Sequence, residues 1–294
     1  MTRIDLHMHS KISLDGEFTP DELMERCHDR SLKVVSLTDH NSVRGIEEAR
    51  VSAERLGMTL IPGIELDCSF ENTNLHILGY GIDFHDPRFN AYEEYVLSQE
   101  VQTTKERVAL IRNLGIMFSD EQIDALAIGG VVTGEMIAEA AMSIESNRDH
   151  PLMQPYYPGG RRSDNPFVNF YWDLCAKGKI AYVEISYMSL KEAVHLIKET
   201  GGIPVFAHPG NNIGKDEALL RGIIATGVKG IEVYSSYHTE ETTRFYLKKA
   251  LEMKLLLTSG SDFHGKTKPG ILLGGTGSGE QEDRILKGLH ESLR

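Results

Sequence analysis

Histidines and carboxylates follow short apolar runs at several points of this sequence, in spacings that suit metal binding. Near the start of the chain, His7 and His9 alternate with Leu6 and Met8, a period of two that indicates a β-strand. Residues i and i+2 share one face of a strand, so both imidazoles point the same way and can hold one metal ion together. The alternative interpretation is a strand with two histidines that face solvent.

The same arrangement recurs along the chain, which favours a shared metal centre. Other short apolar runs end in, or contain, His40, Glu65, His76, His208 and the pair Asp262 and His264. In parallel α/β barrels the functional side chains gather where strands end, so we expect these residues to meet. With the first strand and its following loop, the candidate ligands are His7, His9, Asp15, His40, Glu65, His76, His208, Asp262 and His264.

This donor set predicts a centre with more than one ion. It supplies only nitrogen and oxygen ligands, which suit Mn, Fe or Zn rather than a thiolate structural site. Nine ligands exceed the needs of one ion, so two or three divalent ions are expected, with a carboxylate such as Glu65 as a bridge. Such centres lower the pKa of a bound water toward ~7 and clamp the oxygens of an in-line phosphoryl displacement.

The elements that must position these residues form an interrupted α/β pattern. Strands are predicted near residues 4, 35, 62, 77, 205, 232 and 257, mostly alternating with amphipathic helices, which indicates a parallel sheet or barrel. Residues 89–185 interrupt this alternation of strands and helices with a mostly helical insertion between the fourth and fifth strands. We expect a barrel of residues 1–88 and 186–294, with the insertion as a lid; a peripheral stabilising module is the alternative.

Composition narrows the class of protein. The 294 residues carry a formal net charge of −12, with a pI of about 5.5, which argues against a broad basic surface for duplex nucleic acid. Three widely spaced cysteines favour a reducing compartment without disulfides. Neither a signal peptide nor an apolar run of about 18 residues is present, so we expect a cytoplasmic protein with no membrane partner.

Five motifs, spaced in order along both barrel portions, resemble those of the PHP (polymerase and histidinol phosphatase) family. They are Asp5-Leu6-His7-Met8-His9-Ser10, Thr38-Asp39-His40-Asn41, Gly63-Ile64-Glu65, Ala207-His208-Pro209 and Ser259-Gly260-Ser261-Asp262-Phe263-His264-Gly265. The resemblance implies a distorted (β/α)7 barrel with a trinuclear metal centre. In the resemblance, three ions share the ligands. The first ion would be bound by His7, His9, Glu65 and Asp262. The second would be bound by Glu65, His76 and His208, and the third by Asp15, His40 and His264.

The insertion makes the chain similar to the stand-alone phosphoesterases of that family, which act on nucleoside 3′,5′-bisphosphates, AMP-like nucleotides or short 5′-phosphorylated RNA. Those members often carry Arg-Pro-His at the start of a cap helix, where this chain has Thr133-Gly134-Glu135. Arg161 and Arg162 are candidates to supply the missing positive charge to a substrate. His238, after the sixth strand, is a candidate to contact phosphate or protonate the leaving group; a histidine at a helix start is the alternative.

The expected function is hydrolysis of a phosphate monoester of a small nucleotide or oligonucleotide end by a metal-activated hydroxide, with Asp262, His264 and His238 in the catalytic site. One alternative is a phosphatase for another small metabolite, such as histidinol phosphate. A second, of a different class, is a non-catalytic metal-binding module. A third is hydrolysis of a C–N bond, although amidohydrolase barrels typically use a strand-end lysine as an extra bridging ligand, and none is evident in this sequence.

Overall fold

The strands of the computed structural model, which describes residues 2–293, form two sheets joined into a ring. A parallel sheet has the order β1-β2-β3, and a six-stranded sheet has the order β6-β4-β5-β7-β8-β9. Leu6 N, just after β1, donates to Ser259 O at 3.0 Å, and Asn41 N, in the loop after β2, donates to Glu65 O at 2.8 Å, so the small sheet bonds to the large one at two places. The strands are β1 (Ile4–Asp5), β2 (Val34–Val35), β3 (Thr59–Leu60), β4 (Gly63–Phe70), β5 (Thr73–Tyr80), β6 (Met188–Ser189), β7 (Ile203–Phe206), β8 (Gly230–Ser235) and β9 (Leu256–Gly260).

All seven predicted strand positions are occupied, with β3 and β4 together forming the third, and the α/β class is confirmed. The expected parallel direction fails at β5, which pairs antiparallel with both β4 and β7. The reason is the connection: Phe70 pairs with Thr73, so only Glu71 and Asn72 join the two strands. A two-residue turn can join antiparallel strands, whereas a parallel crossover needs a dozen or more residues. The ring is therefore a distorted barrel.

Helices pack around the barrel, and the local sequence explains where they begin. In α1 (Pro20–Asp29), Thr19 and Glu22 form a capping box, which satisfies backbone N–H groups at the first turn. Ser189 and Glu192 do the same for α7 (Leu190–Glu199). The other barrel helices are α2 (Ile46–Arg55), α8 (Pro209–Ile213), α9 (Glu217–Ala225), α10 (Glu240–Glu252) and α11 (Glu282–Ser292).

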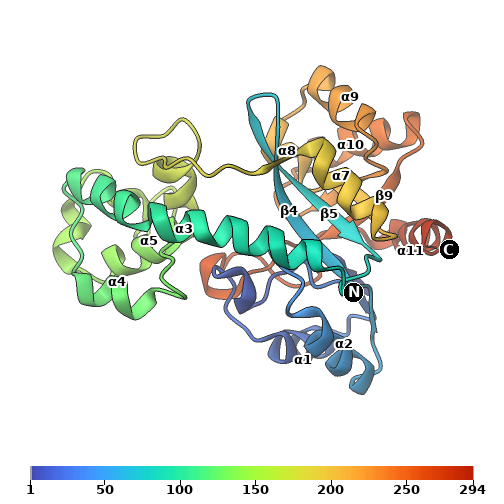
Figure 1. Cartoon of the computed structure of the whole chain (residues 1–294), viewed down its shortest axis with the longest axis horizontal. Helices are drawn as coiled ribbons and strands as arrows, with labels where there is room; N and C mark the ends of the chain where they lie inside the picture. Colours follow the sequence, from blue (N-terminus) through green and yellow to red (C-terminus); the bar gives the residue numbers. More distant parts are fainter. Residues whose placement is uncertain (1, 294) are drawn as a thin grey trace.

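The insertion extends to one side of the barrel on a long helix, α3 (Pro87–Asn113), as Figure 1 shows. Phe89 and Tyr92 at the start of α3 belong to the hydrophobic core of the barrel, whereas Val108 and Ile111 near its end belong to a second core. That second core also contains residues of α4 (Asp120–Leu126), α5 (Gly134–Met142), α6 (Pro166–Phe170) and the π-helical turn η4 (Tyr171–Cys175). An irregular stretch over residues 176–187 leads back to β6.

Short 3₁₀ turns complete the chain: η1 (Lys11–Ser13), η2 (Glu145–Asp149), η3 (Gln154–Tyr156), η5 (Gly265–Thr267) and η6 (Gly279–Gln281). Two of them matter for the site, because η1 follows the end of β1 and η5 follows the end of β9. Within residues 2–293, no helix is both long enough and apolar enough to cross a membrane.

Candidate metal centre

Glu65, on β4, stands at the middle of the site and is completely buried. Its Oε2 lies 3.1 Å from Nε2 of both His7 and His9 and 3.3 Å from Nδ1 of His40. Its Oε1 lies 3.0 Å from His76 Nδ1 and 3.1 Å from His208 Nε2. A carboxylate that faces histidines through both of its oxygens has the geometry required of a bridging ligand, as the sequence predicts.

Two of the predicted ligand groups are brought together in full. His7, His9, Glu65 and Asp262 place one ligand atom each within 4.8 Å of one another, and so do Glu65, His76 and His208. Asp262 Oδ1 lies 3.3 Å from His7 Nε2 and 3.0 Å from His9 Nε2. The residues that follow β1 and β9 therefore meet the start of β4, although His7 and Asp262 are 255 residues apart in the chain.

The third predicted group differs in one member. His40 and His264 gather with His9, whose ring stacks on that of His264 with centroids 4.0 Å apart. Asp15 lies beside this group, with Oδ2 3.0 Å from His264 Nε2. The structure thus brings all nine candidate residues to one place, with His9 shared between two groups.

Asp67 is a candidate ligand that the sequence analysis missed. It groups with His40 and His76, its Oδ1 lying 3.5 Å from His40 Nδ1 and 3.3 Å from His76 Nε2. Asn41 holds the other oxygen by donating to Oδ2 at 2.7 Å. Asp67 is two residues after Glu65 on β4 and so shares its face, which is the same i, i+2 signal that identified His7 and His9.

Three further residues around the centre were also missed. Glu232, buried in β8, has Oε1 2.9 Å from His7 Nδ1 and accepts a hydrogen bond from His208 N at 2.8 Å. Tyr237 and Lys268 both donate to Asp262 Oδ2. Glu232 lies inside the apolar run of β8, as His76 does in β5, so the same signal was available for it; Tyr237 and Lys268 lie in loops and carry no such signal.

The backbone at two of the candidate ligands is strained. His208 has φ of 25° and Asp262 has φ of 57°, in the left-handed region that side chains with a Cβ rarely adopt. Each such conformation costs on the order of 1–3 kcal/mol and persists where the surrounding structure or the function demands it. The strain fits residues whose side chains must turn inward just where a strand ends.

The charges of the centre are strongly coupled. Burial alone would raise the pKa of Glu65, but the neighbouring imidazoles of His7 and His76 hold it well below the usual range. Burial would lower the pKa of His40, yet the carboxylates of Glu65 and Asp67 raise it to about 10. His9 has the opposite shift, because burial and the imidazoles of His264 and His40 lower its pKa. The buried carboxylates thus favour the charged form of His40, whereas the neighbouring imidazoles disfavour that of His9.

The residues present fit a group of divalent metal ions. Several buried side-chain atoms that face one another have no hydrogen-bond partner, which is rare for polar groups in a folded interior. These atoms are His7 Nε2, His9 Nε2, Asp15 Oδ1, His40 Nδ1, Glu65 Oε2, Asp262 Oδ1 and His264 Nε2. All are imidazole nitrogens or carboxylate oxygens, the donors that Mn, Fe and Zn accept.

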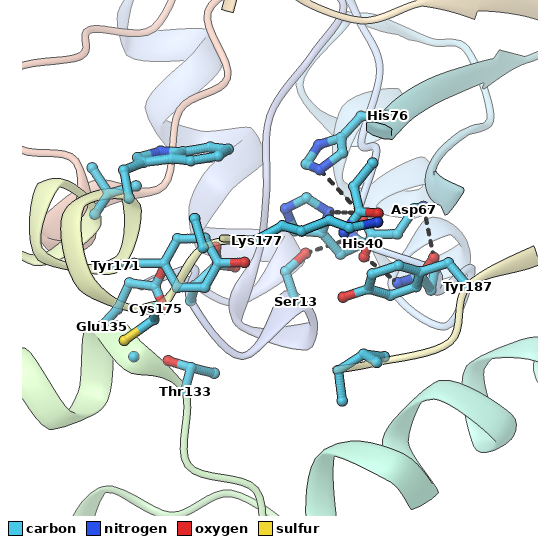
Figure 2. A pocket seen from close by; sticks show the side chains of 18 of the residues that line it. Ser13, His40, Asp67, His76, Thr133, Glu135, Tyr171, Cys175, Lys177 and Tyr187 are labelled. Carbon is cyan, nitrogen blue, oxygen red and sulfur yellow. Dashed lines mark hydrogen bonds and ion pairs between the residues drawn. The ribbon is translucent and has the colours of Figure 1, made fainter. Parts of the chain in front are cut away.

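A cavity of about 620 Å³ opens over the centre, within the size range of sites for small ligands. Its walls come from both parts of the chain. Figure 2 shows Glu135 and Tyr171 of the insertion on one side and His40 and His76 of the barrel on the other. The cavity wall also includes Lys177, in the stretch that leads out of the insertion.

Three predicted substrate contacts do not lie on this cavity. Arg162 pairs with Asp173 inside the insertion, with Nε 3.0 Å from Oδ2, and neither it nor the exposed Arg161 lines the cavity. His238 has both ring nitrogens engaged by the backbone, Nδ1 2.9 Å from Val233 O and Nε2 accepting from Gly210 N at 3.0 Å. This geometry argues against a phosphate contact by these residues and supports a structural role for His238.

Comparisons with known proteins agree with this geometry. The sequence profile of the PHP domain family matches residues 5–127. A 3′,5′-nucleoside bisphosphate phosphatase from Chromobacterium violaceum is 32% identical, over 94% of this chain and 92% of the relative. A 5′-3′ exoribonuclease from Haemophilus influenzae is 29% identical, over 89% and 90% of the two chains. The solved structure of a protein from Bifidobacterium adolescentis, assigned as a metal-dependent phosphoesterase, has a TM-score of 0.75 at 25% identity and covers 97% of this chain and 96% of its own.

Proposed function

Because this chain belongs to the PHP family of metal-dependent phosphoesterases, we propose that it hydrolyses a phosphate monoester of a small nucleotide or of a 5′-phosphorylated oligonucleotide end. The single observation that carries the proposal is the set of buried, unpartnered donor atoms that converge on Glu65 below the cavity. The nucleotide part rests on the relatives, whose names describe a nucleoside bisphosphate phosphatase and an exoribonuclease.

We assign the metal ligands in three groups. His7, His9, Glu65 and Asp262 would hold one ion and Glu65, His76 and His208 a second, as their spacing supports. Asp15, His40 and His264 would hold a third, with His9 and Asp67 close enough to take part. When bound, divalent ions in such a centre supply an activated water and positive charge for the phosphoryl oxygens. The identity of the ions among Mn, Fe and Zn is left open by this donor set.

We propose that residues 89–185 form a cap domain over a barrel of residues 1–88 and 186–294. The separate hydrophobic core of the insertion supports this division, and so does its contribution to the cavity wall. Tyr171 and Trp172 offer aromatic faces to that cavity, and Lys177 offers a positive charge. A nucleotide presents a flat base and negative charge, which matches these groups.

The test is phosphate release by purified protein reconstituted with Mn²⁺. The panel contains AMP, adenosine 3′,5′-bisphosphate, a short 5′-phosphorylated RNA, histidinol phosphate and p-nitrophenyl phosphate. We expect preference for one of the nucleotides, and loss of both activity and bound metal in His9→Ala and Asp262→Ala. His195→Ala, which changes an exposed histidine of α7, is the matched control and should behave as wild type.

Two results would redirect the proposal. Preference for histidinol phosphate would support a phosphatase for a different metabolite. Full metal content with no turnover of any member of the panel would support a non-catalytic metal-binding module. Retention of full activity by His9→Ala or Asp262→Ala would overturn the assignment of the centre itself.

A further inference from the structure

Asp262 is held from two opposite sides. Its Oδ1 faces the imidazoles of His7 and His9, as described above. Its Oδ2 accepts a hydrogen bond from the Tyr237 hydroxyl at 2.6 Å and another from Lys268 Nζ at 2.7 Å. One carboxylate therefore joins the metal-ligand cluster to a lysine ammonium group.

Lys268 is unusual for a lysine in this chain, because only 6% of its surface is exposed. Its ammonium group has three N–H donors. Among residues 2–293 its one hydrogen-bond partner is Asp262 Oδ2, and the Tyr237 ring lies 5.4 Å from Nζ. The residue lines the cavity above the centre. A buried cation with donors to spare is thus placed at the wall of the space where a substrate must sit.

Support of Asp262 alone does not account for a lysine at this place. Tyr237 already donates to Oδ2, so a neutral hydroxyl supplies a hydrogen bond to that oxygen. A cation on a metal-ligating carboxylate draws electron density away from the metal and so weakens the ligand. Burying an ammonium group also costs free energy unless it is well paired. Both costs are offset if the ammonium binds a second anion that enters the cavity.

We propose that Lys268 is a catalytic residue that binds a non-bridging oxygen of the substrate phosphoryl group, and this inference rests on the proposed phosphoesterase function. Lysine acts toward phosphate as a point charge with rotatable donors, so it can keep Asp262 and add a phosphoryl oxygen. An ammonium fixed beside the site stabilises the negative charge of the transferring group without reorganising during the reaction. Tyr237 and Asp262 position it.

The experiment measures binding of inorganic phosphate, the expected product, to protein reconstituted with Mn²⁺, together with metal content and steady-state kinetics. Lys268→Met should weaken phosphate binding about 10- to 100-fold at unchanged metal content, since it removes one charged hydrogen bond. Lys268→Arg, which keeps the charge, should retain more of the affinity than Lys268→Met. Lys287→Met is the matched control, because its side chain is exposed on α11 and lies off this cavity.

The outcomes separate this inference from the proposed function. If wild type hydrolyses phosphate esters and Lys268→Met binds phosphate as well as wild type does, the role of Lys268 is refuted and the function stands. If phosphate binding depends on Lys268 but no ester is hydrolysed, the anion site stands and the function fails. If Lys268→Met and Lys268→Arg both lose metal, or neither folds, Lys268 acts only through the structure around Asp262 and the inference is overturned.

Discussion

Replacing Glu232 by Gln would test how the protein sets the protonation of a metal ligand. Glu232 is completely buried and receives two donors, His7 Nδ1 at 2.9 Å and the backbone N–H of His208 at 2.8 Å. An ionised carboxylate accepts from both. With a metal bound, the His7 ring would therefore keep its proton on Nδ1, toward Glu232, and offer the lone pair of Nε2 to the metal. Gln has almost the same shape, but one of its two terminal atoms is a donor.

The amide would face two N–H donors with a single acceptor. Either one donor is left unpaired in the interior, or His7 moves its proton to Nε2 and loses the lone pair that a metal needs. Loss of such a carboxylate partner typically lowers metal affinity 10- to 100-fold. That range corresponds to roughly 1.4–2.7 kcal/mol of binding free energy. We expect this loss for the ion at His7, with little change in the shape of the barrel.

The measurement is competition for Mn²⁺ between the protein and a chelator of known affinity, with circular dichroism to confirm folding. Glu94→Gln, an exposed position on α3, is the matched control and should keep wild-type affinity. If folded Glu232→Gln bound Mn²⁺ within twofold of wild type, the carboxylate would not set the protonation of His7, and the reasoning above would be wrong.

Three other results are expected. His40 has a pKa of about 10, so metal binding at pH 7 should release about one proton from it. Calorimetry in buffers of different ionisation enthalpy should show one proton fewer released by His40→Ala, and equal release by the two proteins would contradict this. Burial and the charge of Asp15 raise the pKa of Glu135 from 4.5 to about 7. The free energy of unfolding of the metal-free protein should therefore fall by at most about 3 kcal/mol as pH rises between these values. In Glu135→Gln, denaturant unfolding should show no such dependence on pH. Arg107→Met removes the partner of Glu100 in the insertion and should cost on the order of 3 kcal/mol in denaturant unfolding, and a loss below 1 kcal/mol would count against this pair.

The sequence was sufficient for the features that depend on local pattern. Strand positions followed from apolar runs. The candidate ligands were chosen by residue type beside or within those runs, and the structure brings them together. The antiparallel direction of β5 was missed because the spacing of apolar residues identifies a strand but not the direction in which it pairs with its neighbours. The two-residue connection at Glu71 and Asn72 was the available signal.

The residues that support the ligands were harder to predict, for a physical reason. Glu232 acts on His7 from 225 residues away, and its place inside an apolar strand does not say which side chain it will face. Arg162 shows the reverse case. Its charge suggested a substrate contact, but Asp173, only eleven residues on, satisfies it within the insertion. Pairing of this kind depends on which surfaces meet, and a single sequence does not contain that information.

The segment that follows β9 explains how the insertion and the centre can act together. Within seven residues it places His264 in the ligand cluster, pairs Lys266 with Glu139 of α5 at 2.8 Å and bonds Lys268 to Asp262. Gly270 N then donates to Asn165 of the insertion at 2.9 Å. Because one short segment contacts both the insertion and Asp262, we expect that a large shift of the insertion would strain the contacts of Asp262. The insertion, which we propose to contact the substrate, is thus tied to the centre that we propose to react with it, even though the two belong to separate hydrophobic cores.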